Sequence, residues 1–157
     1  KTSKLNSTNV RGVYHMKPVQ KNKEDYIFFE SYRTRWRDND VYGHMNNTIF
    51  YEFADSIVNH WLNVSGALKV PNDSIRGLVV HTRCDYFSQL AYPDDVICGL
   101  KIADIGKTSV KYDIGLFKPD QFYCAAQILF IHAYVDSLKL SPVCLPRSLI
   151  AALKTIS

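Results

Sequence analysis

The chain has 157 residues, of which 46% are hydrophobic and 22% are charged, and its formal net charge is +4. This length suits one domain with or without a tail, and the apolar content excludes a wholly disordered chain, because enough apolar surface is present to offset the entropy lost on folding. No apolar run approaches the roughly 20 residues that a membrane-spanning helix needs, so the sequence predicts no transmembrane segment.

The positive charge is concentrated at the start of the chain. All 15 acidic residues and 13 of the 19 basic residues follow position 23, so residues 24–157 carry a net charge of −2. Nucleic-acid-binding modules concentrate basic groups on the folded domain, so the sequence predicts no nucleic-acid partner. We expect residues 1–24 to form a basic, flexible N-terminal extension, with a targeting segment as the alternative, and residues 25–157 to form a single domain.

The four cysteines, Cys84, Cys98, Cys124 and Cys144, form no C-x-x-C pair and precede no histidine at zinc-ligand spacing. They indicate free thiols in a reducing compartment, and the sequence contains no secretory signal with an apolar segment. We therefore expect a cytoplasmic, mitochondrial or other organellar protein that is not secreted.

The first predicted elements are a strand and a helix. Residues 30–37 alternate strictly between arginine and less polar side chains such as Trp36, which predicts a strand with one buried face and one solvated arginine face. After a polar stretch, apolar residues recur at i, i+3, i+4 and i+7 from Thr48 to about Leu62. They are Phe50, Phe53, Ala54, Ile57, Val58, Trp61 and Leu62. This spacing predicts a helix buried on one side, with Asn46 or Asn47 as its N-cap.

Four more strands are predicted near residues 78–89, 95–103, 108–117 and 122–136, and a short helix near 148–156. The third of these strands alternates apolar with polar or small residues and is expected to be half-exposed, whereas the fourth is nearly all apolar over residues 125–135 and is expected to be buried. The order of one strand, one helix and four strands indicates an α+β fold, an antiparallel sheet curling around a single buried helix.

The polar segment at residues 38–47 reads D-x-D-x-x-G-H-x-N-N and lies directly before the helix. The first N–H groups of a helix are unpaired donors at its positive end, and they can stabilise a carbonyl oxygen that gains negative charge. A nearby carboxylate can act as a nucleophile or as a general base towards water. These residue types favour attack on an acyl carbonyl, while a polar loop with capping Asn and turn Asp residues is the alternative.

This segment, with the helix after it, resembles the 4-hydroxybenzoyl-CoA thioesterase-like branch of the hotdog-fold thioesterase superfamily, and the resemblance extends over roughly residues 27–140. Residues 40–47 are also similar to the signature of bacterial long-chain acyl-CoA thioesterases and plant acyl-carrier-protein thioesterases. The resemblance implies a curved antiparallel sheet wrapped around one long central helix. It also implies a homodimer or tetramer with sites between subunits, and hydrolysis of acyl-CoA to free acid and CoA, as in fatty acid metabolism, without a cofactor.

The resemblance assigns the catalytic carboxylate, as general base or nucleophile, to Asp40, and it makes Asp38 structural. His44 is expected to orient Asp40 or to bind water, and Asn47 to lie near the substrate carbonyl. No metal ligand is implied. The acid of other hotdog branches lies on the central helix instead, and Glu52 keeps that alternative open together with Asp55.

Three further residues are expected to contact substrate, Gly43 and Asn46 of the motif and Thr48 directly after it. Gly43 allows the backbone to approach closely, and the amides near Asn47 and Thr48 are expected to polarise the thioester oxygen. Aromatic residues that can shape an acyl pocket, although they fit a core equally well, are Tyr42, Phe50, Tyr51 and Tyr86.

Two other functions remain open. A catalytically silent hotdog subunit would bind an acyl or protein partner without turnover. A hydratase of the same fold is disfavoured, because the motif precedes the helix as it does in thioesterases. Outside the motif, His60 and His132 are expected to be packing or surface residues, and His81 lies in a strand that relatives use at their dimer interface.

Overall fold

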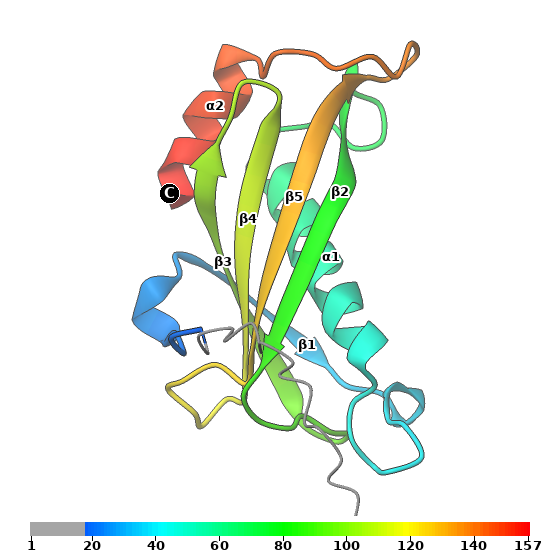
Figure 1. Cartoon of the computed structure of the whole chain (residues 1–157), viewed down its shortest axis with the longest axis vertical. Coiled ribbons are helices and arrows are strands. Elements are labelled where there is room, and N and C mark those ends of the chain that lie inside the picture. Colours follow the sequence, from blue (N-terminus) through cyan, green and yellow to red (C-terminus); the bar gives the residue numbers. More distant parts are fainter. Residues whose placement is uncertain (1–17) are drawn as a thin grey trace, which may run out of the picture.

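The computed structural model describes residues 18–157, in which an antiparallel sheet packs against an 18-residue helix (Figure 1). The strands are β1 (Phe28–Arg33), β2 (Ile75–Tyr86), β3 (Asp95–Ile105), β4 (Ser109–Phe117) and β5 (Ala126–Asp136), in the spatial order β1-β3-β4-β5-β2. The helices are α1 (Asn47–Val64) and α2 (Arg147–Leu153), with the short 3-10 helices η1 (Lys23–Asp25), η2 (Trp36–Asp38) and η3 (Lys154–Ile156). Among these residues, no helix has the length and apolarity to cross a membrane.

Helix α1 follows its sequence pattern closely. The side chain of Asn46 accepts a hydrogen bond from the Thr48 amide and caps the helix, as the polar segment predicts. Its buried residues are the seven of the predicted apolar stripe, and they join side chains of the sheet in one core. The predicted α+β class with an antiparallel sheet is confirmed.

The strand predicted at residues 30–37 is too long, since β1 ends at Arg33. The reason is a turn closed by Asp38, whose carboxylate accepts a hydrogen bond from the Arg35 amide at 2.7 Å and whose own amide donates to the Arg35 carbonyl at 2.9 Å. The chain therefore leaves the sheet, and Trp36, which alternation placed on the buried face, is 81% exposed.

Arg35 does not belong to a solvated arginine face either. Its guanidinium donates to the buried Asp38 carboxylate, with Nε 3.0 Å from Oδ1, and to Glu52 of α1 at 2.7 Å. These ion pairs fix the loop before α1 against the helix. Glu52 is thereby engaged in a structural contact.

Strand β4 is more buried than its alternating sequence predicts, because the chain before β1 covers its outer face. Asp113 forms an ion pair with Lys21 and accepts a hydrogen bond from the Tyr26 hydroxyl at 3.2 Å. The Tyr26 ring lies over Gly115, where a Cβ atom would come within 2.6 Å of it. Of the expected N-terminal extension, residues 1–17 lie outside the described residues. The Lys21 amide donates a hydrogen bond to the Gln127 side chain, and the Lys21 carbonyl accepts one from the Cys124 amide.

Strand β2 forms one edge of the sheet and pairs only with β5 among the described residues (Figure 1). Its middle is exposed on both faces, and Leu78, Val79 and Val80 are 42%, 46% and 61% exposed. A register shift between Val79 and His81 marks a bulge at this point. The sheet thus ends in a twelve-residue strand with apolar side chains and a free hydrogen-bonding edge.

Candidate active site

The loop between η2 and α1 is folded around the carboxylate of Asp40. Its Oδ1 accepts hydrogen bonds from the amides of Tyr42 at 2.8 Å and His44 at 3.2 Å, and the Asp40 amide donates to the His44 carbonyl at 2.7 Å. Gly43 completes the turn with φ of +80°, a left-handed conformation that glycine adopts without strain. A Cβ at Gly43 would meet no heavy atom within 4 Å, so the structure requires glycine there for its backbone angle.

The two oxygens of Asp40 consequently differ. Oδ1 is held by two peptide N–H groups, whereas Oδ2 accepts no hydrogen bond from any residue in the range 18–157. A carboxylate with one oxygen fixed and the other free has a defined orientation and an available lone pair. These are the properties that a general base or nucleophile needs.

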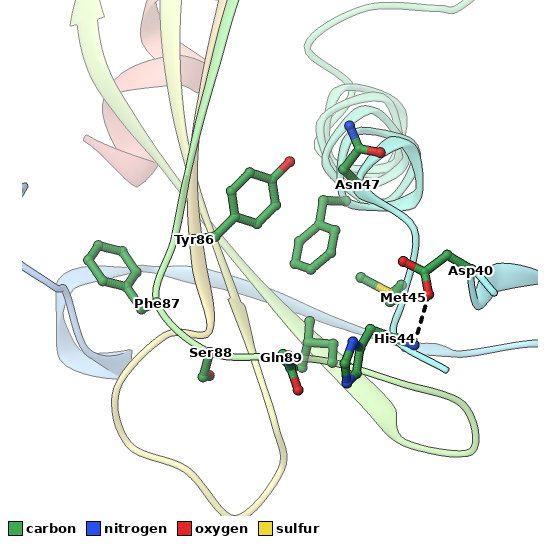
Figure 2. A pocket seen from close by; sticks show the side chains of 10 residues that line it. Asp40, His44, Met45, Asn47, Tyr86, Phe87, Ser88 and Gln89 are labelled. Atoms are coloured by element: carbon green, nitrogen blue, oxygen red, sulfur yellow. Dashed lines mark hydrogen bonds between the residues drawn. The ribbon is translucent and has the colours of Figure 1, made fainter. Parts of the chain in front are cut away.

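A cavity of about 440 Å³ opens beside this loop, within the usual range for small-molecule sites. The residues that line it are Asp40, His44, Met45, Asn47, Phe50, Tyr86, Phe87, Ser88, Gln89 and Leu90. Figure 2 shows Asp40, His44 and Asn47 on the side of α1 and its preceding loop, and Tyr86 to Gln89 on the opposite side. The structure therefore brings the three expected catalytic residues to one cavity.

One wall of the cavity is apolar and includes the hydroxyl of Tyr86. The Phe50 ring meets the Tyr86 ring edge-to-face at 5.0 Å, and Met45 and Leu90 are buried beside them. Burial, with the Cys84 thiol as a smaller cause, raises the pKa of Tyr86, so its hydroxyl stays protonated and can donate a hydrogen bond. Such a wall suits an apolar acyl group, with Tyr86 as a polar contact.

The first turn of α1 offers one free amide to this cavity. The Thr48 amide and hydroxyl both lie 3.0 Å from the Asn46 side-chain oxygen, so the cap occupies the Thr48 donor. The Asn47 amide has no hydrogen-bond partner among the residues that the structure describes. Gly43, Asn46 and Thr48 do not line the cavity, and they shape the loop and the helix end next to it.

Sequence reasoning missed half of the lining. Met45 and residues 87–90 contribute to the cavity, and the Met45 amide donates to the Leu90 carbonyl at 2.7 Å. Residues 87–90 lie more than 40 positions from Asp40, and no local pattern links the two segments. Of the aromatic residues considered for the pocket, Phe50 and Tyr86 line it and Tyr42 and Tyr51 do not. Within residues 18–157, no group of three or more His, Cys, Asp or Glu side chains is placed to hold a metal ion.

This fold, with a carboxylate beside the N-terminus of the helix, is that of a thioesterase-like protein. Residues 34–153 match the family model of the thioesterase-like superfamily, and the chain belongs to that family. The expected membership of the hotdog-fold thioesterase superfamily is thereby confirmed.

Similar proteins are known in several bacteria. The chain is 38% identical to the PA5185 protein of Pseudomonas aeruginosa strain PAO1, and the two structures match with a TM-score of 0.84 over 88% of this chain and 96% of that one. Slr0204, a 1,4-dihydroxy-2-naphthoyl-CoA thioesterase from Synechocystis, has the same fold, with a TM-score of 0.73, 17% identity and coverage of 81% and 95%. YsmA of Bacillus subtilis (strain 168) is 26% identical over 94 residues, which are 59% of this chain and 63% of YsmA, less than two thirds of its length.

Proposed function

We propose that this protein hydrolyses acyl-CoA thioesters to the free acid and CoA, and that Asp40 is the reacting carboxylate. The observation that carries the proposal is the geometry of Asp40, with Oδ1 fixed by two amides and Oδ2 free at a cavity beside the N-terminus of α1. The substrate is a small molecule, and no metal or redox cofactor takes part. The four free cysteines suit a reducing compartment, such as the cytoplasm or the mitochondrial matrix.

In the general-base route, Asp40 takes a proton from water as the water oxygen bonds to the thioester carbon. The carbonyl oxygen becomes an oxyanion, which the free Asn47 amide and the positive end of α1 stabilise. The C–S bond then breaks, and the CoA sulfur leaves as the thiol with the proton from Asp40. In the nucleophilic route, Oδ2 attacks the carbon and expels the thiolate, and water hydrolyses the resulting anhydride. In both routes His44 positions Asp40 through its peptide N–H.

The protein works as a homodimer in this proposal, with a tetramer as the larger alternative. The free edge and the exposed apolar side chains of β2 suit antiparallel pairing with β2 of a second copy. A two-fold axis near Val80 would place the first residues of one β2 beside the last residues of the other. This pairing joins the two sheets, which then curve around the helices as the hotdog fold implies, and it puts the partner subunit next to the cavity wall at Tyr86.

The test is hydrolysis of a panel of acyl-CoA thioesters, both aliphatic and aromatic. The rate is measured from the release of the CoA thiol. Removal of a general base typically costs about 10²–10⁴ in rate, so we expect Asp40→Asn to lower kcat at least about a hundredfold. Its melting temperature should stay close to that of the wild type, since an Asn oxygen can still accept the amide hydrogen bonds.

Asp38→Asn is the matched control, two residues away. Asp38 is fully buried and outside the cavity, so this variant should lose stability before it loses specific activity. Absence of turnover on every substrate, or turnover that Asp40→Asn leaves unchanged, would contradict the proposal. Tight acyl-CoA binding without turnover would identify a silent subunit, and hydration of an enoyl-CoA would identify a hydratase.

A further inference from the structure

His132 of β5 is a buried histidine without hydrogen bonds. Its side chain is 3% exposed, and neither ring nitrogen has a partner among the described residues. The rings of Tyr112 and Phe130 pack against it with centroid distances of 4.9 and 6.2 Å, which fixes its orientation. Burial lowers the pKa of His132 to about 4, so at neutral pH it presents one N–H donor and one lone pair. Both sites lack partners, which native structures rarely tolerate.

A cavity of about 70 Å³ lies against this imidazole, large enough for a few non-hydrogen atoms. We call it the His132 cavity, and it is bounded by Asn59 and Leu62 of α1 and by Ile75 and Gly77 of β2. A Cβ at Gly77 would lie 2.9 Å from Nδ1 of His132. The absence of a side chain at Gly77 therefore leaves the ring nitrogen reachable from the cavity.

The charged groups around the His132 cavity are occupied elsewhere. Asp73 lines the cavity, and its carboxylate accepts hydrogen bonds from the amides of Lys69 and Ser74. Arg76 also lines it and donates to the Ser137 carbonyl. The buried polar group of the cavity is thus the neutral imidazole, with the side-chain oxygen of Asn59 as a second acceptor, since the Asn59 Nδ2 donates to the Asp55 carbonyl. The donor and lone pair of the imidazole are complementary to a hydroxyl group, which also donates and accepts.

The position of the cavity connects it to the active site of a second subunit. In the proposed dimer, the β2 strands run antiparallel about a two-fold axis near Val80, which is close to the middle of the strand. Ile75 at its start then lies beside the partner subunit's Tyr86 at its end, and Gly77 follows two residues further along the same strand. Because Tyr86 lines the cavity of Asp40, the acyl group bound there would point towards the His132 cavity across the interface.

We propose that the His132 cavity receives a hydroxyl group on the acyl chain whose thioester is bound at Asp40 of the partner subunit. The protein therefore selects hydroxylated acyl groups over unsubstituted ones of equal length. This assignment rests on the proposed hydrolysis and on the β2 dimer. His132 acts as a specificity-determining residue in it, and takes no part in the bond changes at the thioester.

The experiment compares matched substrates, the CoA esters of unbranched acids of 6 to 12 carbons with and without a terminal hydroxyl. The wild type should prefer one or more hydroxylated members by at least about tenfold in kcat/KM, since a site built to hydrogen-bond a hydroxyl can discriminate by up to about 10⁴–10⁵. His132→Leu should bring that ratio to about one. The matched control is His60→Leu, an exposed histidine of α1 paired with Glu30, and it should keep the wild-type ratio. A ratio of one in the wild type, or one that His132→Leu does not change, overturns the proposal.

Mixed dimers test the crossing of the interface. Asp40→Asn subunits are combined with His132→Leu subunits, so that the intact Asp40 in a mixed dimer faces an intact His132 only on the partner. Recovery of the hydroxyl preference in the mixture is the expected result. A mixture that stays unselective overturns the assignment to the partner's site. If His132→Leu fails to fold, Gly77→Ala replaces it, because its methyl group would come within 2.9 Å of Nδ1 and force the imidazole to shift from its position at the cavity.

A binding measurement separates this inference from the proposed function. If no thioester is hydrolysed, the proposed function fails, and the His132 cavity is then tested with ω-hydroxydecanoyl-CoA as an NMR probe. The ¹⁵N signals of the His132 ring should shift with this probe and not with decanoyl-CoA. Equal shifts with the two compounds, or no shift with either, would overturn the assignment of the cavity.

Discussion

Replacement of Lys21 tests whether the chain before β1 is part of the folded domain. Asp113 is 7% exposed, and its carboxylate is compensated by the Lys21 ammonium and the Tyr26 hydroxyl. Lys21→Met keeps the aliphatic stem and removes the charge. The Asp113 carboxylate is then left on the outer face of β4 with one neutral donor.

The magnitude follows from the burial of the two partners. Loss of one partner of a fully buried ion pair costs about 3–5 kcal/mol. The Lys21 side chain is 31% exposed, so solvent screens part of the interaction and we expect a loss of about 2 kcal/mol. For a domain of this size, each kcal/mol lowers the melting temperature by about 2–4 °C, so Tm should fall by about 4–8 °C.

The assay is thermal and urea unfolding at one protein concentration, because dimerisation makes stability concentration-dependent. A double-mutant cycle with Asp113→Asn isolates the pair, since Lys21→Met should cost little once the carboxylate is gone. An equal cost of Lys21→Met in both backgrounds would refute the reasoning. So would a change within experimental error in the wild-type background.

Substitutions at four other positions follow from the same geometry. Gly43→Ala should lower stability by about 1–2 kcal/mol because of its left-handed φ, and Gly43→Asn by less, as urea unfolding would show. Asn46→Ala should cost about 1 kcal/mol of cap energy, and Asn46→Ser should restore it. Because the pKa of His132 falls from 6.5 to about 4 on burial, the unfolded state binds more protons between these values; stability should therefore fall as pH drops through this window, and His132→Leu should flatten the profile. Val80→Lys should shift the proposed dimer towards monomer in size-exclusion chromatography, because like charges would meet near the two-fold axis.

The helix and the positions of the strands along the chain could be read from the sequence, because both depend on patterns within one element. The apolar stripe of α1 predicted its buried face, and the strands predicted near residues 95–103 and 108–117 correspond to β3 and β4. The end of β1 could not be read in this way. Alternation continues through Trp36, but the hydrogen bond from the Arg35 amide to Asp38 turns the chain out of the sheet, and alternation contains no information about that turn.

The burial of β4 and half of the cavity lining were missed because both depend on segments far apart in the chain. Lys21 contacts Asp113 across more than 90 positions. The alternation within a strand contains no information about an ion pair with a lysine so far away in the chain. Leu90 meets Met45 across 45 positions. In both cases the tertiary fold, and not the local sequence, determines which group is the hydrogen-bond or ion-pair partner.

The two carboxylates of the motif show how environment separates groups that sequence alone leaves equivalent. Asp38 is fully buried, and the Arg35 amide and guanidinium occupy its oxygens, so it can neither accept a proton from substrate water nor reach the cavity. Asp40 lies two residues later, where Gly43 turns the loop and two amides hold one oxygen while the other stays free. The resemblance assigned catalysis to the second acid, and the hydrogen bonding independently favours the same choice. Exchange of the two roles would need Arg35 to release Asp38, which would also release its contact with Glu52 and detach the loop from α1.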